Sequence, residues 1–216
     1  MSRITRRNFL HSSAAVGTSF LILGTKASGN ILGANDRIRI AVAGLNGRGQ
    51  SHLSGWMEQD NVEVAYVIDP DEAVRARTMK RMESQTEGNV STRDVADVRE
   101  ALADKNLDAI SVATPNHWHS LMTIWAAQAG KHVYVEKPMS HDVVEGRVAV
   151  EAQKKYGVVV QHGTQRRSSS SIAVLHAAFQ AGKFGPLKIS YGYCCKPRGS
   201  IGHEPITQPP DDLDWN

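Results

Sequence analysis

The sequence has very little cysteine, and this limits what can hold it together. Cys194 and Cys195, which are adjacent, are the only two among its 216 residues. Neighbouring residues of a strand point to opposite faces, so a bond between these two would be strained, and no C-x-x-C spacing is present. We therefore expect two buried thiols, with no disulfide framework and no cysteine-based metal site.

Acidic residues are missing from one end of the chain. Residues 1–27 contain no Asp or Glu but carry Arg3, Arg6 and Arg7, followed by the mildly apolar segment 9–23. That segment is too short and too polar to span a bilayer stably, so the pattern predicts an export signal over 1–27 and a linker over 28–36. The run from Thr5 to Leu10 resembles a twin-arginine signal, which implies passage through that export machinery and a location outside the cytoplasm. The alternative is a basic N-terminal tail.

The excess of positive charge belongs to this same segment. Without Arg3, Arg6, Arg7 and Lys26, 21 basic and 22 acidic residues remain, so the formal charge changes from +3 to −1. Nothing in the remaining chain indicates a basic surface, and we expect no nucleic-acid partner.

A glycine cluster follows the first apolar alternation of the chain. The run from Arg37 to Gly49 reads RIRIAVAGLNGRG, which predicts a short strand, a glycine turn and then a helix over 50–59. Glycine lets the backbone approach a diphosphate, and the free N–H groups at a helix start favour negative charge. Asparagine stands where the dinucleotide motif has its second glycine, and Asn tolerates positive φ better than most residues. The predicted cofactor contacts here are Gly44, Asn46, Gly47, Arg48 and Gly49.

An aspartate lies at the spacing expected for a nucleotide ribose. Asp69 comes 20 residues after Gly49 and directly follows the apolar strand predicted over 62–68. A carboxylate at this place accepts hydrogen bonds from ribose hydroxyls and repels a 2′-phosphate. The sequence therefore predicts NAD rather than NADP as the cofactor.

Strands and helices alternate through residues 37–160, which predicts a doubly wound α/β domain with a parallel sheet. Further helices are expected over 71–84, 94–103, 116–129 and 142–156, with Val144, Val148 and Ala152 facing inward in the last. Further strands are expected over 108–113, 131–135 and 158–160. Special residues follow the strands and so should share the carboxyl edge of the sheet, where such folds bind ligands: Gly44, Asp69, Thr114, Glu136 and Gln161.

The pattern changes after residue 160. A helix bearing Ile172, Leu175 and Phe179 is expected, followed by a strand over 187–193. The strand would open a new sheet, so residues 161–216 are predicted to begin a second, α+β domain that the chain does not complete.

Three segments together resemble the glucose-fructose oxidoreductase, inositol dehydrogenase and MocA (Gfo/Idh/MocA) family. They are the glycine loop at 44–49, ATPNHWH at 113–119, and GKHVYVEKP at 130–138, whose Glu-Lys-Pro is the most specific. The similarity runs from about residue 37 to 193. It implies a Rossmann domain followed by an open-sheet domain, nicotinamide-dependent redox chemistry on sugars, cyclitols or related polyols, and a homo-oligomer of the full-length protein.

The resemblance also implies roles for individual residues. Lys137 matches the family's active-site lysine, which would hold or relay the alcohol proton. His119 matches the histidine of the family's P-N-x-x-H motif and is assigned a catalytic role as well. Glu136 would contact or orient the cofactor ribose, and Pro138 would fix the turn, with a cis bond as one option. The remaining assigned cofactor contacts are Thr114, Pro115, Asn116, His119, Lys137, Gln165 and Arg166.

Alternatives stay open at several of these positions. His117 and His119 could suggest a metal pair, but they diverge at a helix start and no third ligand is evident, so no metal is assigned. Arg166 and Arg167 could equally cap the new domain. The family's second motif, an aspartate followed by a histidine, does not occur before Asn216. A redox-neutral NAD-dependent glycosidase or lyase, or an inactive nucleotide-binding fragment, therefore competes with a dehydrogenase.

Overall fold

The structure is a computed structural model that describes residues 37–86, 88, 91–193, 199–200, 202–203, 205–211 and 213–214. The predicted signal over 1–27, the linker over 28–36 and the cysteine pair lie outside the described residues. All elements described below belong to the unit Ile38–Asn216.

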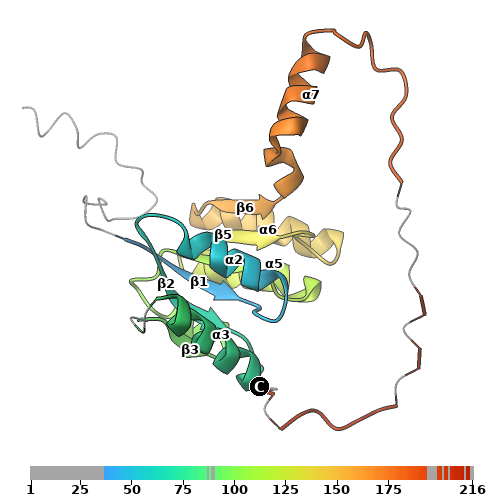
Figure 1. The fold of residues 1–216 in the computed structure, drawn as a ribbon. Helices are drawn as coiled ribbons and strands as arrows, with labels where there is room; N and C mark the ends of the chain where they lie inside the picture. The colour runs from blue at the N-terminus through green and yellow to red at the C-terminus, as the bar shows by residue number, and fades with distance from the viewer. Residues whose placement is uncertain are drawn as a thin grey trace, which may run out of the picture. The chain divides into compact units, whose positions relative to one another are not determined.

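Six parallel strands form one sheet in the order β3-β2-β1-β4-β5-β6 (Figure 1). The chain moves outward from β1 in one direction and then resumes on its other side with β4. This reversal is the topological switch point at which doubly wound sheets bind their ligands. The strands are β1 Ile38–Ala43, β2 Val62–Ile68, β3 Arg93–Val95, β4 Ala109–Val112, β5 His132–Glu136 and β6 Val160–Gly163.

Helices follow the strands as the alternation predicts. Asp71, Asp97 and Asp142 each precede a helix and accept backbone N–H groups two or three residues further on, which satisfies donors left free at a helix start. The helices are α2 Arg48–Met57, α3 Glu72–Gln85, α4 Val98–Leu102, α5 Asn116–Gln128, α6 Val143–Tyr156 and α7 Ser170–Gln180, with a short 3₁₀ turn η2 Gln165–Ser168 before α7.

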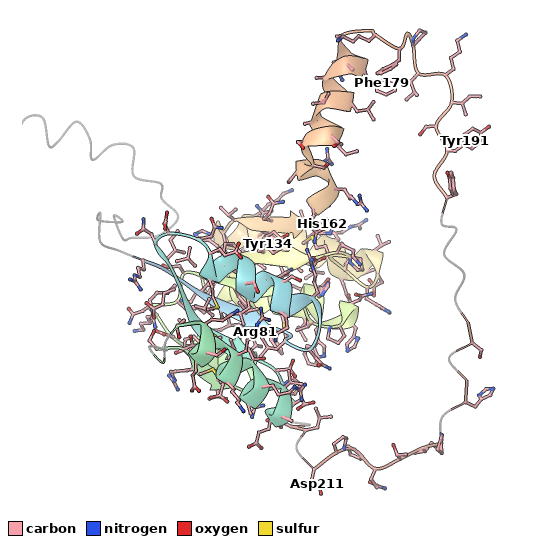
Figure 2. The ribbon with its side chains drawn as sticks, viewed as in Figure 1. Arg81, Tyr134, His162, Phe179, Tyr191 and Asp211 are labelled. Carbon is pink, nitrogen blue, oxygen red and sulfur yellow. The ribbon has the colours of Figure 1, made fainter. Side chains whose placement is uncertain are left out.

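Alternate residues of β1 are buried on opposite faces of the sheet. Ile40 and Val42 pack with Leu53 of α2 and Val74 of α3, on the face that is in front in Figure 1. Ala41 and Ala43 belong to a second cluster with α4 and α5. Three hydrogen bonds join α2 and α3. Arg81, which is labelled in Figure 2, donates to Gln50 Oε1 at 2.6 Å and to Ser54 Oγ at 2.8 Å, and Gln50 Nε2 donates to Thr78 Oγ1 at 2.9 Å. Apolar layers on both faces are what a parallel sheet requires.

The helix predicted over 94–103 is wrong at its beginning. Residues Arg93–Val95 instead form β3, which pairs with β2, and the helix starts only at Val98. Val95, Val98 and Leu102 are buried as expected. The helical spacing of these apolar residues hid a three-residue strand because pairing with β2 is a tertiary contact that local periodicity does not record.

The inward face predicted for α6 is also wrong in part. The side chains of Val144 and Val148 are exposed by 70% and 43%, whereas Ala149 and Ala152 are buried. Ala152 packs in a cluster with Ala127 of α5. Small residues therefore form the contact and let the two helices approach closely, while the larger valines face outward.

Two further predictions near the end of the chain fail. Gln161 lies within β6 rather than after it, paired with Tyr134. The segment 187–193 forms no strand, and its large apolar side chains are exposed. A strand needs a partner for its backbone hydrogen bonds, and no described residue pairs with this segment. The helix with Ile172, Leu175 and Phe179 is confirmed as α7. Within the described part of the chain, no helix is both long and apolar enough to cross a membrane.

Candidate functional site

Two glycines make the first turn possible, and we call residues 44–49 the glycine cradle. Gly44 has φ +84°, and a Cβ placed on it would lie 2.6 Å from the Thr114 backbone nitrogen. A Cβ on Gly49 would lie 1.6 Å from the carbonyl oxygen of Gly44. The loop after β1 thus packs directly against the loop after β4, with α2 starting at Arg48. This is the strand, turn and helix start that can bind a diphosphate through backbone N–H groups.

Asn46 does not adopt the positive φ that the sequence analysis considered for it. Among the described residues, the only non-glycine with positive φ is Asn61. Asn46 is exposed, and its Oδ1 accepts a hydrogen bond from Arg77 at 3.4 Å. The turn therefore accommodates asparagine in an ordinary conformation.

Asp69 ties the glycine cradle to the end of β2. Its Oδ2 accepts the Leu45 backbone N–H at 2.8 Å, and its Oδ1 accepts the Asp71 N–H at 3.1 Å. Each carboxylate oxygen has a second lone pair, so Asp69 can still accept hydroxyl groups of a ribose. The residue positions the loop as well as offering the predicted contact.

A cavity of about 540 Å³ opens at the carboxyl ends of β4, β5 and β6. Eight of the predicted site residues line it, namely Arg48, Thr114, Asn116, His119, Glu136, Lys137, Gln165 and Arg166, together with Ala113 and Ser169. Gly44, Asn46, Gly47, Gly49 and Asp69 belong to the cradle region instead, and Pro115 caps α5. Arg167 does not line the cavity. The structure thus places the predicted residues in two adjacent regions.

Lys137 is one of two cations of the cavity lining that form no ion pair with a described residue, and the other is Arg166. Lys137 is exposed, and its ammonium makes no hydrogen bond or ion pair with any described residue. The peptide bond between Lys137 and Pro138 is cis, which is the option that the resemblance raised. An unpaired ammonium in a cavity can donate to a hydroxyl oxygen and relay the hydroxyl proton to water.

Glu136 is buried beneath Lys137 and receives several donors. Its Oε1 accepts Arg48 Nε at 2.7 Å and a short contact from Gln165 Nε2, while its Oε2 accepts the Lys137 backbone N–H at 2.8 Å. His52 Nε2 lies 3.4 Å from Oε1. Burial opposes ionisation, but the hydrogen bonds from Arg48, the Lys137 N–H and His52, with the charge of Arg48, outweigh it and lower the pKa of Glu136 to about 2.

His52 is the site residue that sequence reasoning missed. It lies on α2, one turn after Arg48, and its side chain is only 5% exposed. Burial lowers the pKa of His52, and this outweighs the opposing effects of Glu136. Its Nδ1 lies 2.9 Å from Ser111 Oγ of β4. Its only signal in the sequence is the four-residue spacing from Arg48, which places both side chains on one face of a helix.

His119 connects two loops of the site. Its Nδ1 faces the Pro138 carbonyl oxygen at 2.5 Å and its Nε2 faces the Thr114 carbonyl oxygen at 2.8 Å. The ring is 1% exposed, so these contacts favour a positioning role over the catalytic role assigned from the sequence. Within the described residues, no group of three or more His, Cys, Asp or Glu side chains could hold a metal ion.

One buried polar group of the cavity lining has no partner within the described residues. Thr114 Oγ1 is inaccessible and makes no hydrogen bond there. The His162 Nε2 atom has the same property but does not line the cavity. The Thr114 hydroxyl, the cradle glycines and Asp69 together fit a dinucleotide that crosses the switch point.

The chain belongs to the Gfo/Idh/MocA family, because the family's sequence profile, described as an oxidoreductase family with an NAD-binding Rossmann fold, matches residues 38–164. The predicted NAD-binding Rossmann domain is thereby confirmed. A 4-carboxy-2-hydroxymuconate-6-semialdehyde dehydrogenase of Sphingobium sp. is 30% identical over 146 residues, 68% of this chain and 44% of the relative. A glycosyl hydrolase family 109 protein of Shewanella sp. is 28% identical over 164 residues, 67% of this chain and 36% of the relative.

Solved structures show the same fold. The WlbA dehydrogenase from Bordetella pertussis, crystallised with NADH and UDP-GlcNAcA, is 26% identical and superimposes with a TM-score of 0.62 over 71% of this chain and 42% of that chain. A myo-inositol 2-dehydrogenase from Lactobacillus plantarum is 24% identical, with a TM-score of 0.61 over 69% and 43%. The chain therefore spans less than half the length of the relatives that it matches.

Proposed function

We propose that this protein is an NAD-dependent dehydrogenase that oxidises a secondary alcohol of a sugar, cyclitol or related polyol. The observation that carries the proposal is the Lys137 ammonium, which lines a cavity at the carboxyl edge of an NAD-binding sheet and has no partner among the described residues. The family membership and the dehydrogenase relatives support it.

The residues of the cavity have distinct tasks in this proposal. The nicotinamide, when bound, supplies the hydride acceptor. Lys137 Nζ donates to the substrate hydroxyl oxygen and relays the hydroxyl proton to water as the C–H bond breaks. Arg48 and Glu136 neutralise each other at 2.7 Å, which leaves the charge of Lys137 directed at the substrate.

The cradle and Asp69 support NAD over NADP. The carboxylate is buried and held by two backbone N–H groups close to the turn. A 2′-phosphate on the ribose would bring a second negative charge to this carboxylate, which costs binding free energy.

Removal of the lysine tests the proposal. We expect the full chain to reduce NAD with a polyol from a panel of sugars and cyclitols, and Lys137→Ala to lower kcat by about 10²- to 10⁴-fold. The affinity for NADH, measured by tryptophan fluorescence, should change by less than about threefold. Lys80→Ala, which removes an exposed lysine of α3, is the matched control. Undiminished turnover in Lys137→Ala would overturn the assignment.

A second candidate is a redox-neutral glycosidase that uses retained NAD only transiently. The family 109 glycosyl hydrolase relatives favour it. A chromogenic glycoside distinguishes the two, because release of the aglycone without net NADH formation supports the glycosidase. Net NADH formation from a free polyol supports the dehydrogenase. A chain that binds NADH but turns over neither class of substrate would be a nucleotide-binding fragment.

We also propose that the protein is exported through the twin-arginine route and acts as a homo-oligomer. Arg6 and Arg7 in an acid-free segment support export. Fusing residues 1–27 to a reporter and replacing both arginines by lysine tests it, since a reporter that still reaches the exterior does not use that route. Sedimentation velocity of the full chain tests the oligomer, and a single monomeric species would exclude it.

A further inference from the structure

His52 lies in a line of hydrogen bonds that runs from the sheet to the active-site lysine. Ser111 of β4 is 2.9 Å from His52 Nδ1, His52 Nε2 is 3.4 Å from Glu136 Oε1, and Glu136 Oε2 accepts the Lys137 backbone N–H at 2.8 Å. His52 and Glu136 are both 5% exposed in their side chains. Four side-chain and backbone groups from three elements are thus connected beneath the cavity.

The chemistry of the partners fixes the direction of each hydrogen bond. An ionised carboxylate only accepts, so His52 Nε2 must carry the hydrogen that points to Glu136. Burial lowers the pKa of His52, so the ring is neutral at pH 7 and Nδ1 has a lone pair that accepts the Ser111 hydroxyl. Arg48 then remains the one full positive charge that contacts the Glu136 carboxylate among the described residues.

We propose that His52 is a positioning residue: its neutral, Nε2-protonated ring holds the Glu136 carboxylate in the orientation that binds the Lys137 backbone and so places Lys137 in the cavity. The ring packs edge-on against Tyr134, with centroids 5.3 Å apart, which fixes the imidazole plane. The other groups that face the ring or the carboxylate are Ser111, Arg48 and Gln165. The link between this position and turnover rests on the proposed function.

Three variants separate the hydrogen bond from the packing. His52→Gln keeps an N–H donor near the place of Nε2, whereas His52→Phe keeps the ring against Tyr134 and loses the donor. Trp56→Phe is the matched control, because Trp56 lies on the same helix and also packs edge-on against Tyr134, with centroids 6.2 Å apart.

Nuclear magnetic resonance of the full chain tests the geometry without any turnover. We expect ¹⁵N spectra at pH 7 to show the Nε2–H tautomer for His52. The Lys137 amide should exchange with solvent about tenfold faster in His52→Phe and near the wild-type rate in His52→Gln and Trp56→Phe. An Nδ1–H tautomer, a charged imidazolium, or equal exchange rates in all variants would overturn the proposal.

Kinetics on the polyol that the wild-type chain oxidises test the consequence. We expect His52→Phe to lower kcat about tenfold with an unchanged Kd for NADH, and His52→Gln to recover most of it. A loss confined to KM or to NADH binding, or no recovery in His52→Gln, contradicts positioning. If the wild-type chain oxidises none of the panel, the proposed function fails, while the tautomer and amide exchange still decide the role of His52.

Discussion

The two halves of the site are built in different ways. The glycine cradle consists of backbone, and its shape follows from two positions where a Cβ would collide with main-chain atoms. The cluster around Glu136 consists of side chains from α2, β5 and η2 that meet at one carboxylate. The first half depends on the absence of side chains and the second on their convergence, so we expect them to respond differently to substitution.

Gly49→Ala should have the largest effect. The new Cβ would lie 1.6 Å from the Gly44 carbonyl oxygen, and backbone cannot move aside as a flexible side chain can. We expect a loss of about 3 kcal/mol or more in the free energy of unfolding by urea, and NADH affinity reduced at least about 100-fold. Gly55→Ala in the same helix is the control. It meets nothing within 4 Å and should stabilise the protein by about 0.5–1 kcal/mol. Equal behaviour of the two variants would contradict the steric account.

Glu136→Gln should have the second largest effect, because it leaves Arg48 without its anion. We expect a loss of about 1–2 kcal/mol in stability at pH 7, because the half-exposed Arg48 is partly solvated by water when its anion is gone. The folded-state pKa of about 2 lies below the ordinary 4.5, so the stabilisation is complete above the ordinary value and is lost as pH falls toward 2. Urea titrations across this range should therefore show wild type and variant converging at low pH.

A matched carboxylate checks that this effect belongs to the cluster. Glu145 accepts the His141 backbone N–H at an exposed position, so Glu145→Gln should change stability by less than about 0.5 kcal/mol. A pH-independent gap between wild type and Glu136→Gln would show that the side chain acts through packing rather than charge.

Asp69→Ala should have a smaller effect, confined to cofactor binding and the loop that it holds. The loss of the acceptor for the Leu45 N–H and of the ribose contact should weaken NADH binding about tenfold. Discrimination against NADPH should decrease because the repelling charge is gone. Asp60→Ala, an exposed carboxylate before β2, should leave both affinities unchanged. Calorimetric titration of NADH and of NADPH into each variant measures these affinities.

Asn46→Gly should have the smallest effect, although it restores the glycine of the usual motif. Asn46 is exposed and does not adopt positive φ, so glycine relieves no strain. We expect NADH affinity within about threefold of wild type. A tenfold gain would show that the asparagine side chain obstructs the diphosphate.

Local sequence was sufficient for the cradle. A strand, a glycine at a position that requires positive φ and a helix start lie within twelve residues, and Asp69 follows at a spacing set by one helix and one strand. The Glu136-Lys137-Pro138 motif likewise located, by resemblance, the lysine that lines the cavity. The residues of each motif lie close together in the chain, so both motifs can be recognised before any tertiary contact is known.

Other features depended on partners far away in the chain. The strand β3 exists because β2 offers it an edge, and α6 turns its alanines inward because α5 lies close. The segment 187–193 has the alternation of a strand but finds no described partner. The periodicity of apolar residues shows which face of a segment could be buried, whereas contact with a neighbouring strand or helix decides which face is buried.

By itself, the sequence determined the parallel α/β domain, the order of strand, turn and helix, and the edge of the sheet on which the lysine lies, because these follow from chain connectivity and residue spacing. The tertiary structure alone decided that Glu136 is an ionised, buried acceptor and that His52 contacts it, since residues 84 positions apart meet only when α2 packs on the sheet beside β5. Burial and hydrogen-bond donors set the charge state of a carboxyl group, and no stretch of sequence contains them.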